Sequence, residues 1–331
     1  MKNLVLVVLA AMAAIVVACC KPEPPKPPVV KVRPAVAIKA ATGVEITKAT
    51  LVAKVVPNEN GTSIVFDYKA QNDANWTTVP VAGLFSGKDS VEVSVALVTL
   101  TANTEYVFRC KAANEAGQTI SSEVKFQAYA VKDYDGNYYH TVTIGTQTWL
   151  KENLKTTHFA NGDPIPNVTD ATAWTKLTTG AYCWYNNDPE IGKTFGALYN
   201  FYVAVDSRLL IIGWHVATDP EWTTMKAYLG NVMDVTLDTS GGKLKEAGTA
   251  HWKTPNTGAT NESGFSALPG GSRQTEAGAF DGLTTDASFW SSTEAPGGCG
   301  WGKVLWYNRQ YLSNDGAYLK EGGMLLRLIK N

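Results

Sequence analysis

The sequence predicts a β-sandwich followed by an α+β domain, both preceded by an N-terminal segment that does not fold. Its 331 residues are enough for two hydrophobic cores, because a single domain usually has about 100 to 200 residues. Short runs in the first part, such as SIVFDYKA and SVEVSVALVTL, alternate apolar and polar residues and therefore predict strands. The second part mixes strand and helix patterns with stretches rich in Gly, Asn, Thr and Ser, which predicts an α+β fold.

Residues 1–18 have the pattern of a secretory signal peptide. Lys2 precedes an apolar run from Leu4 to Val17, which is shorter than the roughly 20 residues that a membrane-spanning helix needs. A retained transmembrane helix is the weaker alternative. The end of the run, Val-Val-Ala-Cys, resembles the bacterial lipobox, whose cysteine receives diacylglycerol. The resemblance implies that Cys19 is lipidated, that the mature chain begins there, and that acyl chains hold the membrane.

Residues 19–34 should form an extended tether. Six prolines lie between Lys21 and Pro34, and a segment so dense in proline adopts polyproline II rather than a helix or a sheet. The segment is therefore expected to act as a spacer.

The composition argues against several functions. A formal net charge of -1 provides no basic field, so nucleic acid is not an expected partner. Apart from the two cysteines at the lipobox, the chain has Cys110, Cys183 and Cys299, an odd set that can form at most one disulfide. No Cys-x-x-Cys pair occurs, so neither a zinc ribbon nor a thioredoxin-like redox site is expected.

Residues 35–130 are expected to form the sandwich. The stretch LTANTEYVFRCKAANEAGQ resembles the end of a fibronectin type III domain, in which a leucine six residues before a tyrosine, here Leu100 and Tyr106, makes the tyrosine corner. The resemblance implies a fibronectin type III or immunoglobulin-like module, which usually serves as a spacer or a weak binder. Cys110 alternates inward with Phe108 and is expected to be a buried apolar residue.

Residues 131–331 carry a series of long motifs, among them GALYNFY, GWHVATDPEW, NESGFSALPGGSR and FWSSTE. In this order they closely resemble the Fibrobacter succinogenes major paralogous domain, a family of extracellular bacterial modules. The segment Gly213–Val216 with the Thr218 and Glu221 that follow is similar to the strand-then-helix signature of C-type-lectin-like folds. The resemblance implies an α+β C-type-lectin-like domain.

The residues of this module support that expectation independently. Tyr138–Ile144 alternates as one strand, and Thr218 with Glu221 three residues later predicts a capping box at the start of a helix. The range Gly241–Ser291 is expected to form long loops on a small sheet, and loops on a rigid scaffold are where binding sites usually lie.

The strongest candidate for a ligand surface is a short polar and aromatic segment. Aromatic faces stack on sugar rings, while amides and carboxylates bind the hydroxyls. The alternative is a strand that ends in an Asn-rich turn, with Trp184 buried. The segment consists of Trp184, Tyr185, Asn186, Asn187 and Asp188, and further candidates for ligand binding are Trp252, Arg273 and Glu294.

No catalytic or metal site is predicted. The segment Gly297–Val304 nearly spells a phosphate-binding loop, but Val304 stands where a hydroxyl should coordinate magnesium. The four histidines are scattered, and His215 is expected to be a hydrogen-bonded structural residue. The triplets with which C-type lectins hold calcium and sugar are missing, so calcium binding through Asp188 is a weak alternative and no cofactor is expected.

The chain departs from the resembled family at two positions. The family commonly has cysteine where this sequence has Leu210 and Leu328. The double exchange implies that a disulfide has been replaced by an apolar contact, with the terminal strand beside the strand that leads into Gly213; two unrelated substitutions are the alternative.

These observations together lead to one expectation about function. The chain should be an envelope-anchored lipoprotein, at the outer membrane or cell surface, that binds a polysaccharide or an envelope protein without catalysis. A purely structural envelope component is the first alternative. A glycan-acting enzyme is the second, and it would need two carboxylates in one cleft, which the sequence does not identify.

Overall fold

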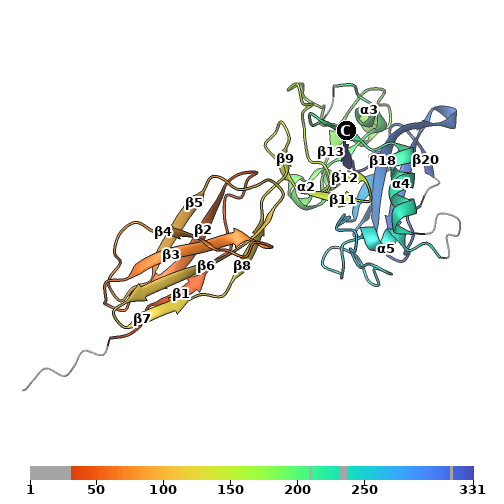
Figure 1. Ribbon diagram of the computed structural model, residues 1–331. Coiled ribbons are helices and arrows are strands. Elements are labelled where there is room, and N and C mark those ends of the chain that lie inside the picture. The colour runs from red at the N-terminus through yellow and green to blue at the C-terminus, as the bar shows by residue number, and fades with distance from the viewer. Residues whose placement is uncertain (1–30, 209, 231–236, 314–315) are drawn as a thin grey trace, which may run out of the picture.

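The computed structural model describes residues 31–208, 210–230, 237–313 and 316–331 (Figure 1). Cys19 and most of the expected tether lie outside these residues. Figure 1 shows two modules placed end to end, and the described chain begins at the end of the first module that is farther from the second. No helix in the described ranges is long and apolar enough to cross a membrane.

The first module is a sandwich of two antiparallel sheets. One sheet has the order β1-β2-β5, and the other has the order β4-β3-β6-β7 with β8 also paired to β6. Alternate residues of the inner strands are fully buried, among them Leu51 and Phe108, as the period-two pattern predicts. The strands are β1 (Ala35–Ile38), β2 (Ala49–Val56), β3 (Ser63–Ala70), β4 (Thr77–Pro80), β5 (Val91–Leu97), β6 (Glu105–Asn114), β7 (Gly117–Ile120) and β8 (Val124–Gln127).

The predicted tyrosine corner is confirmed. The Tyr106 hydroxyl accepts a hydrogen bond of 2.8 Å from the Thr101 N–H, and Leu100 is buried beneath it. Cys110 is fully buried, and its burial raises the pKa of the thiol to about 12. Its sulfur therefore serves as packing and is not a reactive thiolate.

A compact joint connects the two modules. The Asn103 side chain donates to the Thr141 carbonyl at 3.1 Å and accepts from the Thr141 N–H at 2.9 Å, in the manner of a strand partner. The Tyr129 ring lies 4.2 Å from the His140 ring and 5.3 Å from the Tyr138 ring. His140 breaks the single strand expected here, because its ring turns back to Gln127 and separates β10 (Tyr138–Tyr139) from β11 (Thr141–Ile144).

The second module combines small sheets with short helices. A four-stranded sheet has the order β11-β12-β21-β15, a five-stranded sheet has the order β17-β16-β18-β19-β20, and two hairpins pair β9 with β10 and β13 with β14. The remaining strands are β9 (Val131–Lys132), β12 (Gln147–Leu150), β13 (Tyr182–Cys183), β14 (Leu198–Tyr199), β15 (Trp214–Val216), β16 (Gly270–Arg273), β17 (Phe280–Leu283), β18 (Asp286–Ala295), β19 (Cys299–Trp306), β20 (Gly316–Leu319) and β21 (Leu328–Lys330). The helices are α1 (Ala171–Trp174), η1 (Tyr185–Asn187), α2 (Pro189–Phe195), α3 (Phe201–Ala204), α4 (Asp219–Leu229), α5 (Ser240–Leu244) and η2 (Pro296–Gly298).

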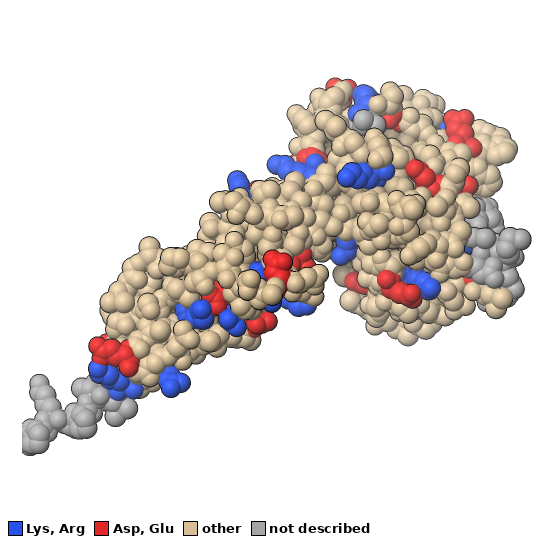
Figure 2. Space-filling view, viewed as in Figure 1, with Lys and Arg blue, Asp and Glu red and all other residues tan. Residues whose placement is uncertain are grey.

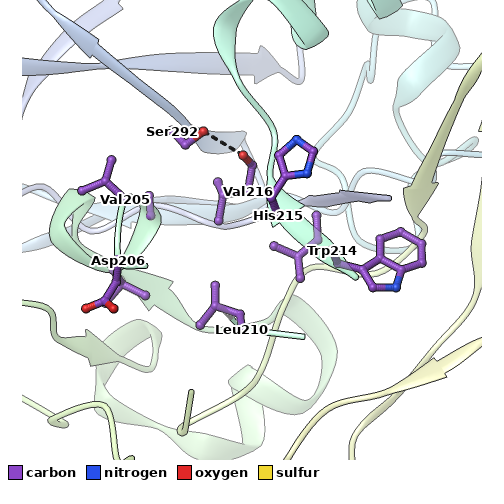
Figure 3. A pocket seen from close by; sticks show the side chains of 10 residues that line it. Val205, Asp206, Leu210, Trp214, His215, Val216 and Ser292 are labelled. Carbon is purple, nitrogen blue, oxygen red and sulfur yellow. Dashed lines mark hydrogen bonds between the residues drawn. The ribbon is translucent and has the colours of Figure 1, made fainter. Parts of the chain in front are cut away.

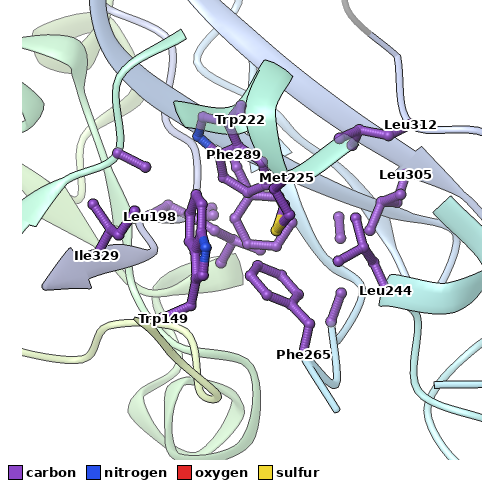
Figure 4. Close-up of a cluster of buried hydrophobic side chains, with 14 of the residues drawn as sticks. Trp149, Leu198, Trp222, Met225, Leu244, Phe265, Phe289, Leu305, Leu312 and Ile329 are labelled. Atoms are coloured by element: carbon purple, nitrogen blue, oxygen red, sulfur yellow. The ribbon is translucent and has the colours of Figure 1, made fainter. Parts of the chain in front are cut away.

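An aromatic cluster forms the core between α4 and the sheets (Figure 4). The rings of Trp149 and Trp222 lie 5.0 Å apart, and Trp222 packs 5.5 Å from Phe289. The predicted capping box fixes the start of α4, because Thr218 and Glu221 exchange side-chain and backbone hydrogen bonds. The capping box thus aims Trp222, on the first turns of α4, into the core.

The long loops expected over Gly241–Ser291 are only partly present. Residues 245–269 are mostly irregular and are held by buried cations, such as Lys245, whose ammonium donates to three backbone carbonyls at 2.9 to 3.0 Å. The rest of the range forms most of α5, the strands β16 and β17 and the first half of β18, with turns between the strands. The glycine-rich sequence did not predict these strands. The strands nevertheless need glycine, because Gly271 and Gly282 have φ of +66° and +82°, a conformation that few other residues adopt.

Candidate functional site

The segment expected to be the ligand surface is a turn. Strand β13 ends, Tyr185 turns into the core next to Phe280, and Asn186 and Asn187 adopt φ of +54° and +58°. Asp188 caps α2 by accepting from the Glu190 N–H at 2.9 Å. The structure therefore matches the alternative, a strand that ends in an Asn-rich turn. It differs in the buried ring, which is Tyr185, while Trp184 remains half-buried.

Two further candidate residues, Trp252 and Arg273, do not offer a ligand surface. Trp252 is 2% exposed and donates its indole N–H to the Ala267 carbonyl. Arg273 is also 2% exposed, and its guanidinium donates to three backbone carbonyls while it stacks 4.5 Å from the Trp174 ring. Both hold loops together, because buried polar groups need internal partners. Glu294 is exposed and pairs with Lys320 at 2.6 Å.

Neither the phosphate-loop match nor His215 forms a reactive site. The segment Gly297–Val304 runs through η2 into strand β19 rather than into a helix, and Lys303 is buried in an ion pair with Asp219. The His215 ring lies 3.0 Å from both oxygens of Glu221 and 2.7 Å from Asn331. His215 is therefore a hydrogen-bonded residue of strand β15, as expected.

A hollow of about 220 Å³ lies beside strand β15 (Figure 3). Leu210 and Leu328 both line it, both are buried, and both belong to one core cluster. Strand β21 pairs with β15, which begins directly after Gly213. The prediction that the terminal strand lies beside a strand leading into Gly213 is therefore wrong. Direct contact of the two leucines stays a prediction. The polar side chains here are already paired, as Asp206 is with Arg208.

A larger hollow, of about 350 Å³, lies on the five-stranded sheet, and we call it the Tyr318 pocket. It lies at the end of β16, near the start of β18 and at the end of β20. Figure 1 shows β20 on the side of the second module that faces away from the sandwich. The lining residues are Ser272, Arg273, Gln274, Thr275, Glu276, Ser288, Tyr318, Leu319, Gly322 and Met324.

Two glycines hold the Tyr318 ring in place. A Cβ atom at Gly316 would lie 1.9 Å from Cε2 of Tyr318, and one at Gly302 would lie 2.8 Å from the same atom. The ring therefore needs both glycines to pack against the sheet. The Trp290 ring meets it edge-on at 6.2 Å. Tyr318 is thus fixed before any ligand arrives, while part of it remains accessible.

The pocket presents hydrogen-bonding groups that the protein does not use. Within the described ranges, the hydroxyls of Ser272, Ser288 and Tyr318 have no hydrogen-bond partner in the protein, and Glu276 forms no ion pair. Arg273 rigidifies the floor, because its N–H and carbonyl pair with Gly323 at 2.8 and 2.9 Å. An aromatic edge surrounded by neutral hydroxyls and one carboxylate suits a polyhydroxylated ring.

The charged groups that line the pocket are the Arg273 guanidinium, which is bound to backbone carbonyls, and the Glu276 carboxylate. Burial, and then the nearby Asp281, raise the pKa of Asp286 to about 6. Burial and the Asp286 carboxylate raise the pKa of Tyr318 as well. With one guanidinium and one carboxylate, the lining has no net charge and suits a neutral ligand.

No signal in the sequence pointed to the Tyr318 pocket. Its residues come from β16, β18 and β20 and from the segments after β16 and β20, which β17 and β19 separate along the chain, so only the folded sheet brings them together. Among the described residues, no group of three or more His, Cys, Asp or Glu side chains could hold a metal ion. Cys110, Cys183 and Cys299 are all free thiols.

On the face shown in Figure 2, the charged side chains do not gather into a second candidate binding surface. Figure 2 shows Lys and Arg mixed with Asp and Glu along the sandwich, and mostly uncharged residues over the second module. A continuous basic field is not visible there, as expected from the net charge of -1.

The fold and the pocket define a class of protein with two modules, a fibronectin type III-like sandwich that carries a separate α+β module. The family model described as Fibrobacter succinogenes major domain matches residues 142–330, more than half of the chain. The chain belongs to this family. No curated protein matches it.

Several solved structures resemble parts of the chain. The sensor domain of the anti-sigma factor RsgI4 from Pseudobacteroides cellulosolvens is 24% identical, with a TM-score of 0.24 over 30% of this chain and 92% of that one. The fibronectin type III domain of human fibronectin type III domain containing protein 3 is 20% identical, with a TM-score of 0.24 over 32% and 94%. Likenesses with such scores carry no argument about function.

Proposed function

We propose that this chain is a lipid-anchored binding protein of the bacterial envelope, whose second module binds a sugar ring of a polysaccharide in the Tyr318 pocket. The observation that carries the proposal is the fixed Tyr318 ring beside hydroxyls that lack a partner in the described protein. A ring that is already fixed favours glycan binding, because it loses little conformational entropy when the glycan binds. The balanced charges of Arg273 and Glu276 in the lining favour neutral sugars.

The arrangement of the modules supports a receptor at a distance from its membrane. The described chain begins at the far end of the sandwich, and β20 lies on the opposite side of the second module (Figure 1). A lipid on Cys19 and a proline-rich tether would therefore place the pocket outward, at the outer membrane or the cell surface. The sandwich serves as the spacer in this proposal.

The proposal includes a C-type-lectin-like second module that works without catalysis. Strand β15 leading into the capped helix α4 supports the lectin-like fold. Glu276 is the one carboxylate among the described residues that line the pocket, whereas glycoside hydrolysis uses a pair about 5 to 10 Å apart. Binding without bond cleavage is what this lining supports.

A glycan array probed with the detergent-solubilised full-length protein tests the binding. We expect Tyr318→Ala to weaken binding of the glycans found by about 1 to 3 kcal/mol, since stacking contacts have that size, and Tyr318→Phe to retain most of it. Tyr228→Ala is the matched control, because Tyr228 is 68% exposed and lies on α4, away from the pocket. Equal binding by the wild type and Tyr318→Ala would refute the site. An array without any bound glycan would favour the structural alternative.

The anchor is tested separately. We expect the wild type to sediment with membranes after a high-salt wash and Cys19→Ala to be released, because the lipid is the proposed attachment. Cys20→Ala is the control and should sediment like the wild type. If Cys19→Ala still sediments, the lipoprotein proposal fails while the glycan site remains open to its own test.

A further inference from the structure

A second hollow contains Trp184, which the Tyr318 pocket does not use. It measures about 280 Å³ and lies between α2 and the segments around residues 135 and 155. We call it the Trp184 pocket. Its lining residues are Asp135, Asn137, Lys155, Thr157, Trp184, Pro189, Gly192 and Lys193.

The Trp184 ring is fixed before binding. A Cβ atom at Gly192 would lie 2.1 Å from Cε3 of the indole, so the ring packs directly on the backbone of α2. The Tyr182 ring meets it edge-on at 5.4 Å and 78°. The indole N–H has no acceptor within the described part of the chain, although Trp184 is half-buried. A fixed aromatic surface with an unused donor is suited to a ring that carries acceptors.

Two lysine ammonium groups belong to residues that line the pocket together with Trp184. The Lys155 ammonium makes one long contact, 3.4 Å to the Lys193 carbonyl, which leaves protons for a ligand. The Lys193 ammonium is already bound to Glu190 at 2.6 Å.

Asp135 also lines the pocket, but both of its oxygens are in use. They accept hydrogen bonds from the side chains of Thr156 and His158 and from the Thr157 N–H and hydroxyl. Burial opposes ionisation here, yet these hydrogen bonds lower the pKa of Asp135. The charge of Asp135 is therefore directed into the protein, and Lys155 is the ion that remains available to a ligand.

We propose that the Trp184 pocket binds a sugar ring that bears a carboxylate, as in the uronic acid residues of acidic polysaccharides. The indole stacks on the apolar face of the ring, and Lys155 pairs with the carboxylate. The two pockets then differ in their cations, since Arg273 in the Tyr318 pocket is bound to backbone carbonyls, whereas Lys155 in the Trp184 pocket remains available. The proposal does not depend on the Tyr318 pocket, because it uses other residues on other elements.

Calorimetric titration of the full-length protein in detergent tests the proposal, with an oligogalacturonate as the acidic probe and its methyl ester as the neutral one. We expect the acidic probe to bind at least tenfold more tightly than its ester at low salt. Lys155→Gln should lose at least tenfold in affinity for the acidic probe and little for the ester. Lys176→Gln, a change of another exposed lysine in the same module, should bind like the wild type.

The aromatic contribution is tested with Trp184→Leu, which should weaken both probes, and with Trp184→Phe, which keeps a ring on Gly192. Tyr318→Ala should leave both affinities unchanged, so a failure of the other pocket does not affect this result. The proposal is overturned if the acidic probe does not bind, if its ester binds equally well, or if Lys155→Gln binds like the wild type. If Trp184→Leu does not fold, the titration of Lys155→Gln with the two probes still tests the proposal.

Discussion

Asp286 should destabilise the second module at neutral pH, and Asp286→Asn should therefore stabilise it. The carboxylate lies at the start of β18 beside Gly282, whose added Cβ would approach Oδ2 to 2.8 Å. Burial is the main cause that raises its pKa to about 6, and the charge of Asp281 adds to it. Asp286 has no salt bridge within the described part of the chain, and the interaction that lowers its pKa is a hydrogen bond with Thr285.

The sign and size follow from the two pKa values. Well below pH 4 the carboxyl is protonated in both the folded and the unfolded state, so it contributes no pH dependence. Between about pH 4 and pH 6 the unfolded state releases its proton first, and the free energy of unfolding falls as the pH rises. A shift of two pKa units corresponds to at most about 3 kcal/mol, and local relaxation should leave about 1 to 2 kcal/mol.

Urea unfolding from pH 3.5 to pH 8, followed for the second module by near-ultraviolet circular dichroism, measures the effect. The stability of Asp286→Asn should match that of the wild type near pH 3.5 and exceed it by a constant amount above pH 6.5. Asp89→Asn is the control, since Asp89 is an exposed carboxylate of the sandwich. A stability difference that does not change with pH would refute the reasoning, as would a variant that is less stable at pH 7.

Three further changes test the packing, each by differential scanning calorimetry. Tyr106→Phe removes the corner hydrogen bond and should cost the sandwich about 1 to 2 kcal/mol, and an unchanged melting temperature would show that the hydroxyl is dispensable. Trp252→Ala empties a buried site and should cost about 3 to 5 kcal/mol; a small loss would mean that the residue is not core. Lys245→Met leaves three buried carbonyls without a donor and should cost about 3 to 5 kcal/mol, so a neutral result would contradict the inferred role.

Local patterns in the sequence predicted the parts of the fold that depend on local chemistry. The alternating runs identified the sandwich strands, because one face of each is buried and the other is solvated. The capping box at Thr218 and the tyrosine corner at Tyr106 were also predictable, since each consists of residues at fixed short spacing.

The ligand site could not be predicted in the same way. Trp252 and Arg273 lie in sequence rich in glycine and asparagine, which is typical of exposed loops, yet each is buried by segments far away in the chain. Tyr318 becomes a fixed surface because of Gly302 on a neighbouring strand and Gly316 on its own. Such long-range packing leaves no periodic signal that a single sequence can reveal.

Strand β21 has a consequence for the order in which the chain can fold. It lies between β12 and β15 in the four-stranded sheet, although it comes from residues 328–330 and its partners come from much earlier. The sheet cannot be completed before residues 328–330 have been synthesised, because one of its inner strands comes from them. Strands β12 and β15 remain without their shared partner until then, so this sheet depends on contacts between segments that lie far apart in the chain.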